Sequence, residues 1–191
     1  MSVFQRPRLD FAFGTHRLKL GLDTKIMGVL NVTPDSFSDG GNYLLPELAL
    51  EQALRMEREG AHILDLGGES TKPGAKPVPV KEEIRRIRPV LKLLTKKVKI
   101  PISIDTYKYD VAMMAFDEGA LILNDIRALG GDKRLPKLVA RYNAGVVLMH
   151  MKGTPESMQK DTRYKNFLNE VLRFLREASD RALQAGVKKE S

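Results

Sequence analysis

Short apolar runs alternate with longer amphipathic stretches along most of the chain. Five apolar runs indicate buried strands, at residues 26–31, 62–66, 102–105, 121–125 and 146–150. Apolar positions at helical spacing predict helices over residues 45–59, 80–97, 109–118, 134–143 and 164–185. Nearly continuous apolar strands that are separated by helices are typical of a parallel sheet that is buried on both faces. The chain is therefore predicted to have an α/β fold.

The first residues depart from this alternation. LDFAF, a Gly14-Thr15-His16 turn and RLKLG predict a β-hairpin within residues 1–22, placed to cap the bottom of a barrel, and five βα units follow in residues 25–186. A TIM-type (β/α)8 barrel has eight such units in about 250 residues. We therefore expect a single domain over residues 1–191 that holds the first five units of a C-terminally incomplete barrel.

An open, doubly wound sheet of five strands is the alternative architecture. That fold commonly places a glycine-rich phosphate-binding turn directly after its first strand. Neither GxGxxG nor GxxxxGK[ST] occurs at that place in the sequence. The barrel is the favoured prediction.

Polar side chains stand at the C-terminal end of every predicted strand. They are Asn31, Asp65, Asp105, Asn124 with its neighbour Asp125, and His150. The carboxyl ends of parallel strands meet at one rim, where ligands bind in both candidate folds. Burying such groups costs free energy unless they are paired, so packing alone explains the pattern poorly. The sequence predicts a functional rim.

Two long loops follow rim strands and carry groups that suit an anion. TPDSFSDGGNY, at residues 33–43, holds hydroxyls, aspartates and paired glycines, and GGESTKPGAKPVP, at residues 67–79, adds Lys72 and Lys76. Glycine backbone, hydroxyl donors and a cation are what a phosphate site needs. A turn-rich surface loop is the plain alternative, but the position of both loops after rim strands favours ligand binding.

Five segments closely resemble the dihydropteroate synthase family, and they occur in the family's order. They are MGVLNVTPDSFSDGG, GAHILDLGGESTKPGA, PISIDTYK, LNDI and VVLMHMKGTP, and residues 31–41 are the most specific part. The resemblance implies an eight-unit barrel, usually a homodimer. It also implies a transferase that joins (7,8-dihydropterin-6-yl)methyl diphosphate to p-aminobenzoate in folate biosynthesis, with Mg²⁺ and with release of pyrophosphate.

The resemblance implies roles for residues around the pterin and the metal. Asn31 matches a ligand of the Mg²⁺ that sits on the diphosphate, which suits an ion that prefers hard oxygen ligands. Asp105 and Asn124 match residues that hold the pterin ring, and Met149 matches an apolar wall of its pocket. Asp105 is also expected to stabilise a pterin cation once pyrophosphate has departed.

Further roles fall in the two loops. Ser70 and Thr71 match diphosphate-binding hydroxyls, and Lys72 stands where many family members have arginine, so bidentate geometry is lost. The loops that close over p-aminobenzoate match Thr33, Pro34, Asp35, Phe37 and Pro73. Asp35 is expected to position the amine or the waters of the metal. The family's remaining site residues follow the fifth unit, so we expect these 191 residues alone to be poorly active.

Two other functions remain open. A pterin-binding methyltransferase shares the barrel and an aspartate/asparagine pair for the pterin ring, but it should lack the TPDSFSDGG loop. A non-catalytic pterin- or phosphate-binding module, as a partial barrel completed by another polypeptide, is the second alternative.

Several neighbouring groups have plainer interpretations. The three histidines lie on different elements, so a histidine metal site is not expected, and His150 is expected to orient a neighbour. Asp65 is expected to bond loop backbone. Tyr107 and Lys108 fit a helix start as well as a ligand set.

The amino-acid composition limits the classes of molecule that the chain is expected to bind. The 32 Lys and Arg against 24 Asp and Glu give a formal charge of +8, with much of the excess in residues 81–99. Apolar residues at helical spacing in that stretch indicate a solvated basic helix face rather than a nucleic-acid site. The absence of cysteine excludes disulfides and thiolate chemistry. With no apolar run of roughly 18 residues and no secretory signal, we expect a cytoplasmic protein without a membrane partner.

Overall fold

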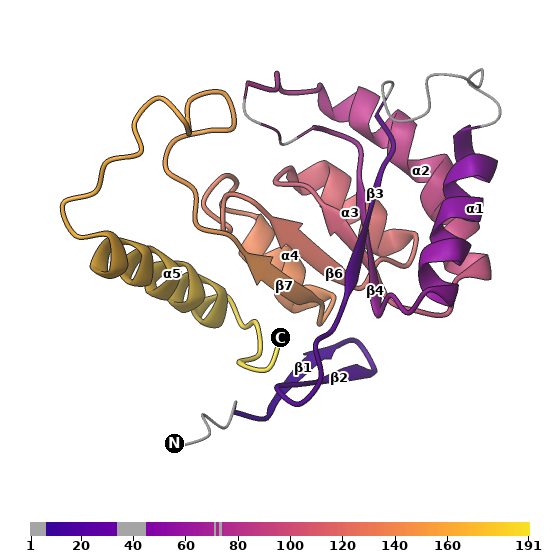
Figure 1. Cartoon of the computed structure of the whole chain (residues 1–191), viewed down its shortest axis with the longest axis horizontal. Helices are drawn as coiled ribbons and strands as arrows, with labels where there is room; N and C mark the ends of the chain where they lie inside the picture. The colour runs from indigo at the N-terminus through magenta and orange to yellow at the C-terminus, as the bar shows by residue number, and fades with distance from the viewer. Residues whose placement is uncertain (1–6, 34–44, 71, 73) are drawn as a thin grey trace.

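The computed structural model describes residues 7–33, 45–70, 72 and 74–191. Its strands are β1 (Leu9–Phe13), β2 (His16–Leu20), β3 (Met27–Asn31), β4 (Ile63–Gly67), β5 (Ile102–Asp105), β6 (Ile122–Asp125) and β7 (Gly145–Leu148). Its helices are α1 (Leu45–Arg58), α2 (Val80–Lys97), α3 (Tyr109–Asp117), α4 (Leu135–Arg141) and α5 (Phe167–Gln184). Strands β3 to β7 alternate with helices, as the hydrophobic pattern predicts (Figure 1).

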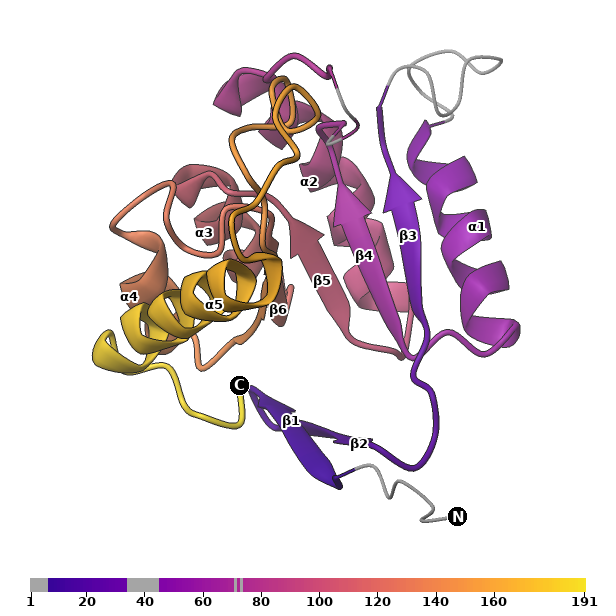
Figure 2. The same cartoon turned by 60° about the vertical axis from the view of Figure 1, so that its left-hand side comes forward.

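The main sheet is parallel, and its strands lie in the order of the chain. The order is β3-β4-β5-β6-β7, and every neighbouring pair is parallel. Figures 1 and 2 agree in placing α1 to α4 along one side of this sheet. A doubly wound sheet reverses its strand order at a switch point, whereas a barrel adds each strand beside the last one. The sheet is therefore part of a TIM-type barrel, which confirms the predicted fold class, and the doubly wound alternative is wrong.

The larger hydrophobic core lies between the sheet and the helices. Because successive strand residues point to opposite faces, every second residue of each strand reaches this core. Fully buried members from the strands are Leu30, Leu64, Leu66, Ile104 and Leu123. Helix α2 contributes Ile87, Val90, Leu91 and Leu94. Each such side chain contributes about 1.5–3 kcal/mol on burial, so this layer fixes the strand register.

The hairpin β1–β2 lies at the opposite end of the strands from the candidate rim (Figure 1). Phe13 packs with Ile63 and Ile122, which are the first residues of β4 and β6. A Cβ at Gly145, the first residue of β7, would come within 2.7 Å of the Phe11 ring, so glycine permits this approach. The hairpin thus occupies the bottom of the barrel segment.

Some element ends differ from the prediction. The fifth barrel strand, β7, ends at Leu148 rather than at residue 150, because its last partner is Asp125 at the end of β6. Helix α5 begins later than residue 164, because the side chain of Asn166 accepts the N–H of Asn169 and caps the helix there. In the hairpin, His16 belongs to β2 rather than to the turn.

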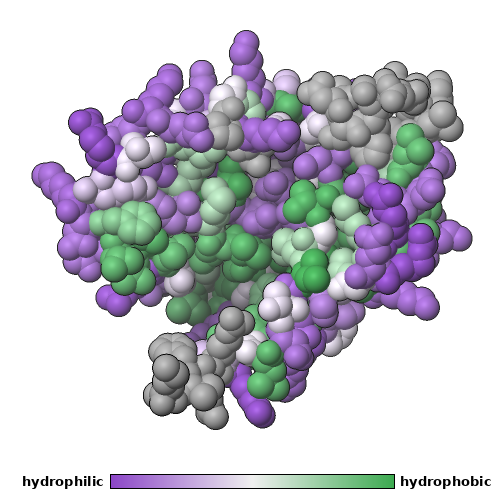
Figure 3. All heavy atoms as spheres, viewed as in Figure 1, coloured by the Kyte–Doolittle hydropathy of each residue, from purple (hydrophilic) through white to green (hydrophobic). Residues whose placement is uncertain are grey.

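The face of the molecule in Figure 3 carries apolar side chains over α5 and the sheet. The large exposed apolar residues of these elements are Val29, Phe167, Leu168, Leu172 and Leu183. Contiguous apolar surface of this kind is typical of a face that contacts other protein. Among the helices of the described residues, none has both the length and the apolar character that crossing a bilayer requires.

Candidate active site

A row of polar side chains crosses the C-terminal ends of the barrel strands. Asn31, Gly67, Asp105 and Asn124 are aligned in register across β3, β4, β5 and β6, and register neighbours project to the same face of a sheet. A Cβ at Gly67 would lie 3.0 Å from Oδ1 of Asn31 and 3.6 Å from Oδ2 of Asp105. The glycine keeps the space between the amide and the carboxyl open. Three sequence-predicted site residues are therefore brought together.

Asp65 and Ser103 lie one step below this row, on the same face. The side-chain amide of Asn124 donates to Oδ2 of Asp65 at 2.9 Å. Asp65 is 3% exposed and Ser103 is fully buried, yet Asp65 Oδ1 and Ser103 Oγ have no hydrogen-bond partner within the described part of the chain. Asp65 was expected to bond loop backbone, and that prediction is wrong because its partner is a side chain. We call Asp65, Ser103, Asp105 and Asn124 the floor cluster.

The bond between Asp65 and Asn124 fixes the orientation of the Asn124 amide. Since Nδ2 is committed to Asp65, the carbonyl oxygen Oδ1 is the group that faces away from it. Buried polar atoms without a partner are rare in proteins and indicate a place for a ligand or water. The floor cluster therefore presents several acceptors, together with the Ser103 hydroxyl and the second N–H of the Asn124 amide.

The electrostatics of the floor cluster are those of crowded carboxyls. Burial raises the pKa of Asp105 to about 7, and the negative charges of Asp65, Glu83, Asp125 and Glu69 act in the same direction. Burial also raises the pKa of Asp65, while the nearby Ser103 hydroxyl and Asn124 amide act to lower it. A ligand that donates N–H groups or carries positive charge stabilises the ionised form of such carboxyls. The cluster is suited to a donor-rich or cationic partner.

Asp125 belongs to a different environment, although the sequence groups it with Asn124 at the rim. It is fully buried and accepts the backbone N–H groups of Arg127 at 2.7 Å and Leu129 at 2.8 Å. These bonds close a turn in which Ala128 and Leu129 have φ angles of 48° and 61°. Asp125 therefore shapes the loop after β6 rather than facing a ligand.

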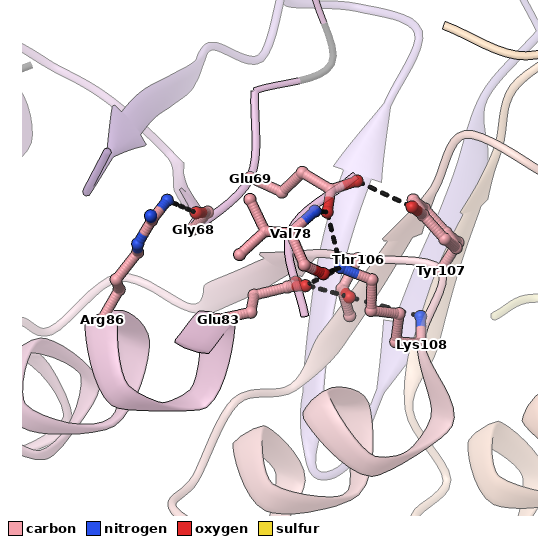
Figure 4. A network of polar contacts seen from close by, with 8 residues as sticks. All are labelled: Gly68, Glu69, Val78, Glu83, Arg86, Thr106, Tyr107 and Lys108. Carbon is pink, nitrogen blue, oxygen red and sulfur yellow. Dashed lines mark hydrogen bonds and ion pairs between the residues drawn. The ribbon is translucent and has the colours of Figure 1, made fainter. Parts of the chain in front are cut away.

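A buried ion network lies beside the floor cluster, at the root of the loop between β4 and α2 (Figure 4). The Lys108 ammonium donates to Oε2 of Glu69 at 2.5 Å, to the carbonyl of Val78 at 2.6 Å and to Glu83. The side chains of Lys108, Glu69 and Glu83 are 12%, 7% and 1% exposed. An ammonium has three N–H groups, so Lys108 has none left for a ligand.

Each oxygen of the two carboxylates in this network also has a partner. The hydroxyl of Thr106 donates to Oε1 of Glu83 at 2.8 Å, and the hydroxyl of Tyr107 donates to Oε1 of Glu69 at 2.7 Å. The N–H of Val78 donates to Oε2 of Glu69 at 2.5 Å. We call this set, with Lys108 at its centre, the Lys108 network.

Neither Glu69 nor Glu83 was predicted from the sequence as a functional residue. A signal for Glu83 was present, because it shares a helix face with Ile87, Val90 and Leu94 at spacings of four, three and four residues. The residue type argued for exposure, and the structure places it in the buried stripe. Tyr107 and Lys108, left open between a helix start and a ligand set, precede α3 and serve the network.

The remaining candidates stand around the row. Ser70 and Lys72 follow β4, Thr33 follows β3, and Met149 follows β7 with 39% of its surface exposed. The other sequence-predicted loop residues lie outside the described residues: Pro34, Asp35, Phe37, Thr71 and Pro73.

His150 lies beyond β7, where its ring packs edge-on against Phe174 of α5 with centroids 4.9 Å apart. Tyr164 is a second aromatic neighbour of the same ring, at 6.0 Å. This contact joins the segment after β7 to α5. His150 therefore serves packing in the described structure.

The side chains of the row determine what kind of metal ion could bind there. In the described ranges, no group of three or more His, Cys, Asp or Glu side chains is placed to hold an ion. Asn31 offers a single exposed amide oxygen at the rim. That donor fits Mg²⁺ when the ion takes most of its ligands from water and from a phosphate-bearing substrate.

The chain matches known proteins across nearly its whole length. Residues 27–191 match the family model described as pterin binding enzyme. The dihydropteroate synthase of Synechocystis sp. is 42% identical over 167 residues, which are 87% of this chain and 58% of the relative. The dihydropteroate synthase of Bacillus subtilis is 46% identical over 164 residues, which are 86% of this chain and 55% of the relative.

Solved structures give the same result. The Xanthomonas albilineans dihydropteroate synthase with 4-aminobenzoic acid superposes with a TM-score of 0.84 at 43% identity, covering 97% of this chain and 64% of that one. The same enzyme in complex with 7,8-dihydropteroate gives a TM-score of 0.79 at 40% identity, covering 96% and 63%. The chain thus spans less than two thirds of the length of the proteins that it resembles.

Proposed function

This chain belongs to the family of pterin binding enzymes, and we propose that it acts as a dihydropteroate synthase. In this reaction the bond between the pterin methylene carbon and the diphosphate oxygen breaks, and a bond from that carbon to the nitrogen of p-aminobenzoate forms. The amine loses one proton, and pyrophosphate leaves. The single observation that carries the proposal is the floor cluster, because its unpartnered acceptors match the donor-rich edge of a pterin.

The floor cluster supports recognition of the pterin ring. A dihydropterin presents a 2-amino group and ring N–H groups along its pyrimidine edge. The carboxylate of Asp105 accepts two such N–H groups, and Asn124 offers Oδ1 because its Nδ2 is held by Asp65. Asp65 Oδ1 and the Ser103 hydroxyl take up further polar atoms of the ring. Ligand binding then satisfies the atoms that lack partners.

The rim next to the floor cluster supports binding of the diphosphate. Ser70 supplies a hydroxyl, Lys72 supplies an exposed cation, and Thr71 is proposed to add a second hydroxyl. Asn31 is the proposed protein ligand of Mg²⁺. That ion, when bound, neutralises charge on the departing diphosphate. Met149 is proposed to border the ring as an apolar wall.

The proposed chemical step needs no covalent intermediate with the protein. As the diphosphate departs, positive charge develops on the pterin, and the carboxyl groups of Asp105 and Asp65 lie on the face that receives it. The loops that contain Thr33, Pro34, Asp35, Phe37 and Pro73 are proposed to cover p-aminobenzoate and exclude water. Asp35 is proposed to position the attacking amine. A homodimer and a cytoplasmic location complete the proposal, and the resemblance alone supports both.

The proposal is tested by titrating the 191-residue chain with the dihydropterin diphosphate ester, with and without Mg²⁺. We expect tighter binding of the ester with Mg²⁺ and, after p-aminobenzoate is added, slow pyrophosphate release that requires both Mg²⁺ and the arylamine. Binding that is indifferent to Mg²⁺ would point to a pterin-binding methyltransferase instead. Mg²⁺-dependent binding without any release would identify a non-catalytic module.

A further inference from the structure

The Lys108 network joins three separate segments of the chain. Glu69 lies near the start of the loop between β4 and α2, Val78 lies near its end, and Glu83 lies in the first turn of α2. Lys108 reaches all of these from the connection between β5 and α3. Because Glu69 also accepts the N–H of Val78, the two ends of the loop are tied directly to each other (Figure 4). The base of the loop is therefore closed.

The base is fastened to α2 as well. A Cβ at Gly68 would lie 2.8 Å from Ile87, so only glycine allows the backbone to approach the helix this closely. The guanidinium of Arg86 donates to the carbonyl of Gly68 at 3.0 Å. The start of the loop thus has little freedom to move relative to α2.

The same network reaches the segment that carries Asp105. Lys108 is three residues beyond Asp105, and its own N–H donates to the hydroxyl of Thr106 at 3.3 Å. The N–H of Thr106 donates to the carbonyl of Asn124 on β6 at 3.1 Å. One rigid block therefore contains the end of β5, the start of α3 and the base of the loop.

A stabilising role explains the Lys108 network poorly. Burying charges costs free energy that their attraction recovers only in part, so buried ion pairs are weak evidence for stability and are often kept because they specify one geometry. Here every oxygen of the two carboxylates and every N–H of the ammonium has a partner. A fully satisfied network of this kind rigidifies its surroundings.

We infer that Lys108, with Glu69 and Glu83, is a positioning unit that holds the loop carrying Ser70 and Lys72 at a fixed distance from Asp105. Lys108 does not contact the anion, since its N–H groups are occupied. The unit sets the spacing between the group that reads the ring and the groups that bind the phosphate. This inference deepens the proposed function and rests on it for the identity of the ligands.

A positioning role and a purely electrostatic role of Glu69 predict opposite changes in anion binding when its charge is removed. Glu69 brings a negative charge to the base of the loop, and that charge by itself disfavours an anion nearby. Removing the charge of Glu69 should then strengthen anion binding if only charge matters. If Glu69 acts by fixing the loop, the same change should weaken anion binding. Glu69→Gln separates the two accounts, because it keeps the shape of the side chain.

The binding test measures affinity for inorganic pyrophosphate with Mg²⁺ and, separately, for 6-hydroxymethyl-7,8-dihydropterin, which lacks a diphosphate. We expect Glu69→Gln to weaken pyrophosphate binding about tenfold and to change pterin binding less than about twofold. Unchanged or tighter pyrophosphate binding, or equal losses for both ligands, would overturn the inference. Lys92→Met is the matched control, because its ammonium is half exposed on α2.

A second measurement is independent of any ligand. In amide hydrogen exchange, the Val78 N–H should exchange about tenfold faster in Glu69→Gln than in the unchanged chain, while the amides of β4 keep their rates. Tyr107→Phe, which removes one hydroxyl, should give a smaller change in the same direction and covers the case in which Glu69→Gln does not fold. If the unchanged chain binds no pyrophosphate, the proposed function fails, and the exchange rates alone decide the inference. Equal Val78 rates in all variants would overturn it.

Discussion

The floor cluster and the Lys108 network are two neighbouring groups of buried polar side chains, and they differ in how completely their hydrogen bonds are made. The floor cluster leaves an oxygen of Asp65 and the hydroxyl of Ser103 without partners in the described structure. In the Lys108 network, every N–H of the ammonium and every oxygen of the two carboxylates has a partner. Burial raises carboxyl pKa values in both, at Asp105 and at Glu83.

This difference in hydrogen bonding distinguishes a ligand-binding site from a structural ion network. A raised pKa alone would mark both groups as functional, since active sites and structural ion networks both perturb titration. Hydrogen-bond completeness distinguishes them, because an unmade bond to a buried polar group costs about 1–3 kcal/mol and a ligand can recover it. On this basis we propose the floor cluster as the ligand-binding site and the Lys108 network as the positioning unit.

The largest expected effect is the loss of stability when the Lys108 network is disrupted. Lys108→Met leaves two buried carboxylates without their cation, and removing one partner of a buried ion pair costs about 3–5 kcal/mol of unfolding free energy. Urea unfolding measures this loss. Lys92→Met should stay within about 0.5 kcal/mol of the unchanged chain, because its ion pair is exposed. A loss from Lys108→Met no larger than that of the control would mean that the network is not a unit.

The next effect concerns pH and the floor cluster. The pKa of Asp105 is about 7 in the folded chain against an ordinary 3.8, so the folded state holds a proton that the unfolded state has lost between these values. Stability should therefore fall as pH rises through this window and level off above it. Asp105→Asn removes the titration and should gain about 2 kcal/mol over the unchanged chain at about pH 8.

Unfolding curves at about pH 4 and about pH 8 check this prediction. The two proteins should differ little at the lower pH, where the carboxyl is protonated in the folded state and still about half protonated in the unfolded state. A constant difference across the range would show that Asp105 does not titrate as its surroundings require.

A smaller effect concerns Asn31, the proposed Mg²⁺ ligand at the edge of the row. Asn31→Ala should weaken binding of the dihydropterin diphosphate ester about tenfold in the presence of Mg²⁺, because one ligand of the ion is lost. Binding of 6-hydroxymethyl-7,8-dihydropterin, which has no diphosphate, should be nearly unchanged. Calorimetric titration of both compounds makes the comparison. Equal losses for the two ligands would remove the metal role from Asn31.

The smallest expected effect tests whether the Ser103 hydroxyl lacks a hydrogen-bond partner in the free protein. Ser103→Ala deletes a buried hydroxyl that has no partner in the described residues. Without ligand, the variant should be as stable as the unchanged chain or more stable, by up to about 1 kcal/mol. With ligand, it should bind the dihydropterin about threefold more weakly. A loss of stability in the free protein would show that the hydroxyl already has a structural role.

The sequence predicted the features that depend on local pattern. Helix α2 begins and ends where its apolar spacing places it, and strand β5 has its predicted bounds, because both bury one continuous apolar face. The row of Asn31, Asp105 and Asn124 was foreseeable, since parallel strands bring their C-terminal ends to one rim. The hydrophobic pattern was sufficient to predict a residue's position wherever its neighbours are determined by the order of the strands.

The features that pattern missed depend on contacts between distant segments. The sequence showed no reason for Lys108 to bond with Glu69 and Glu83, which come from a loop and a helix that meet only in the folded chain. Asp125 and Asn124 are adjacent, yet alternation along β6 sends one to the helices and the other to the row. The end of β7 before His150 followed from the length of its partner strand.

The central claim is that the floor cluster binds a pterin through its acceptors. Calorimetric titration of 6-hydroxymethyl-7,8-dihydropterin into the unchanged chain and into Asp105→Asn tests it most directly. The variant keeps the shape of the side chain but replaces an acceptor oxygen with a donor, so we predict a loss of affinity of about a hundredfold or more. Equal affinity for the two proteins would contradict the account.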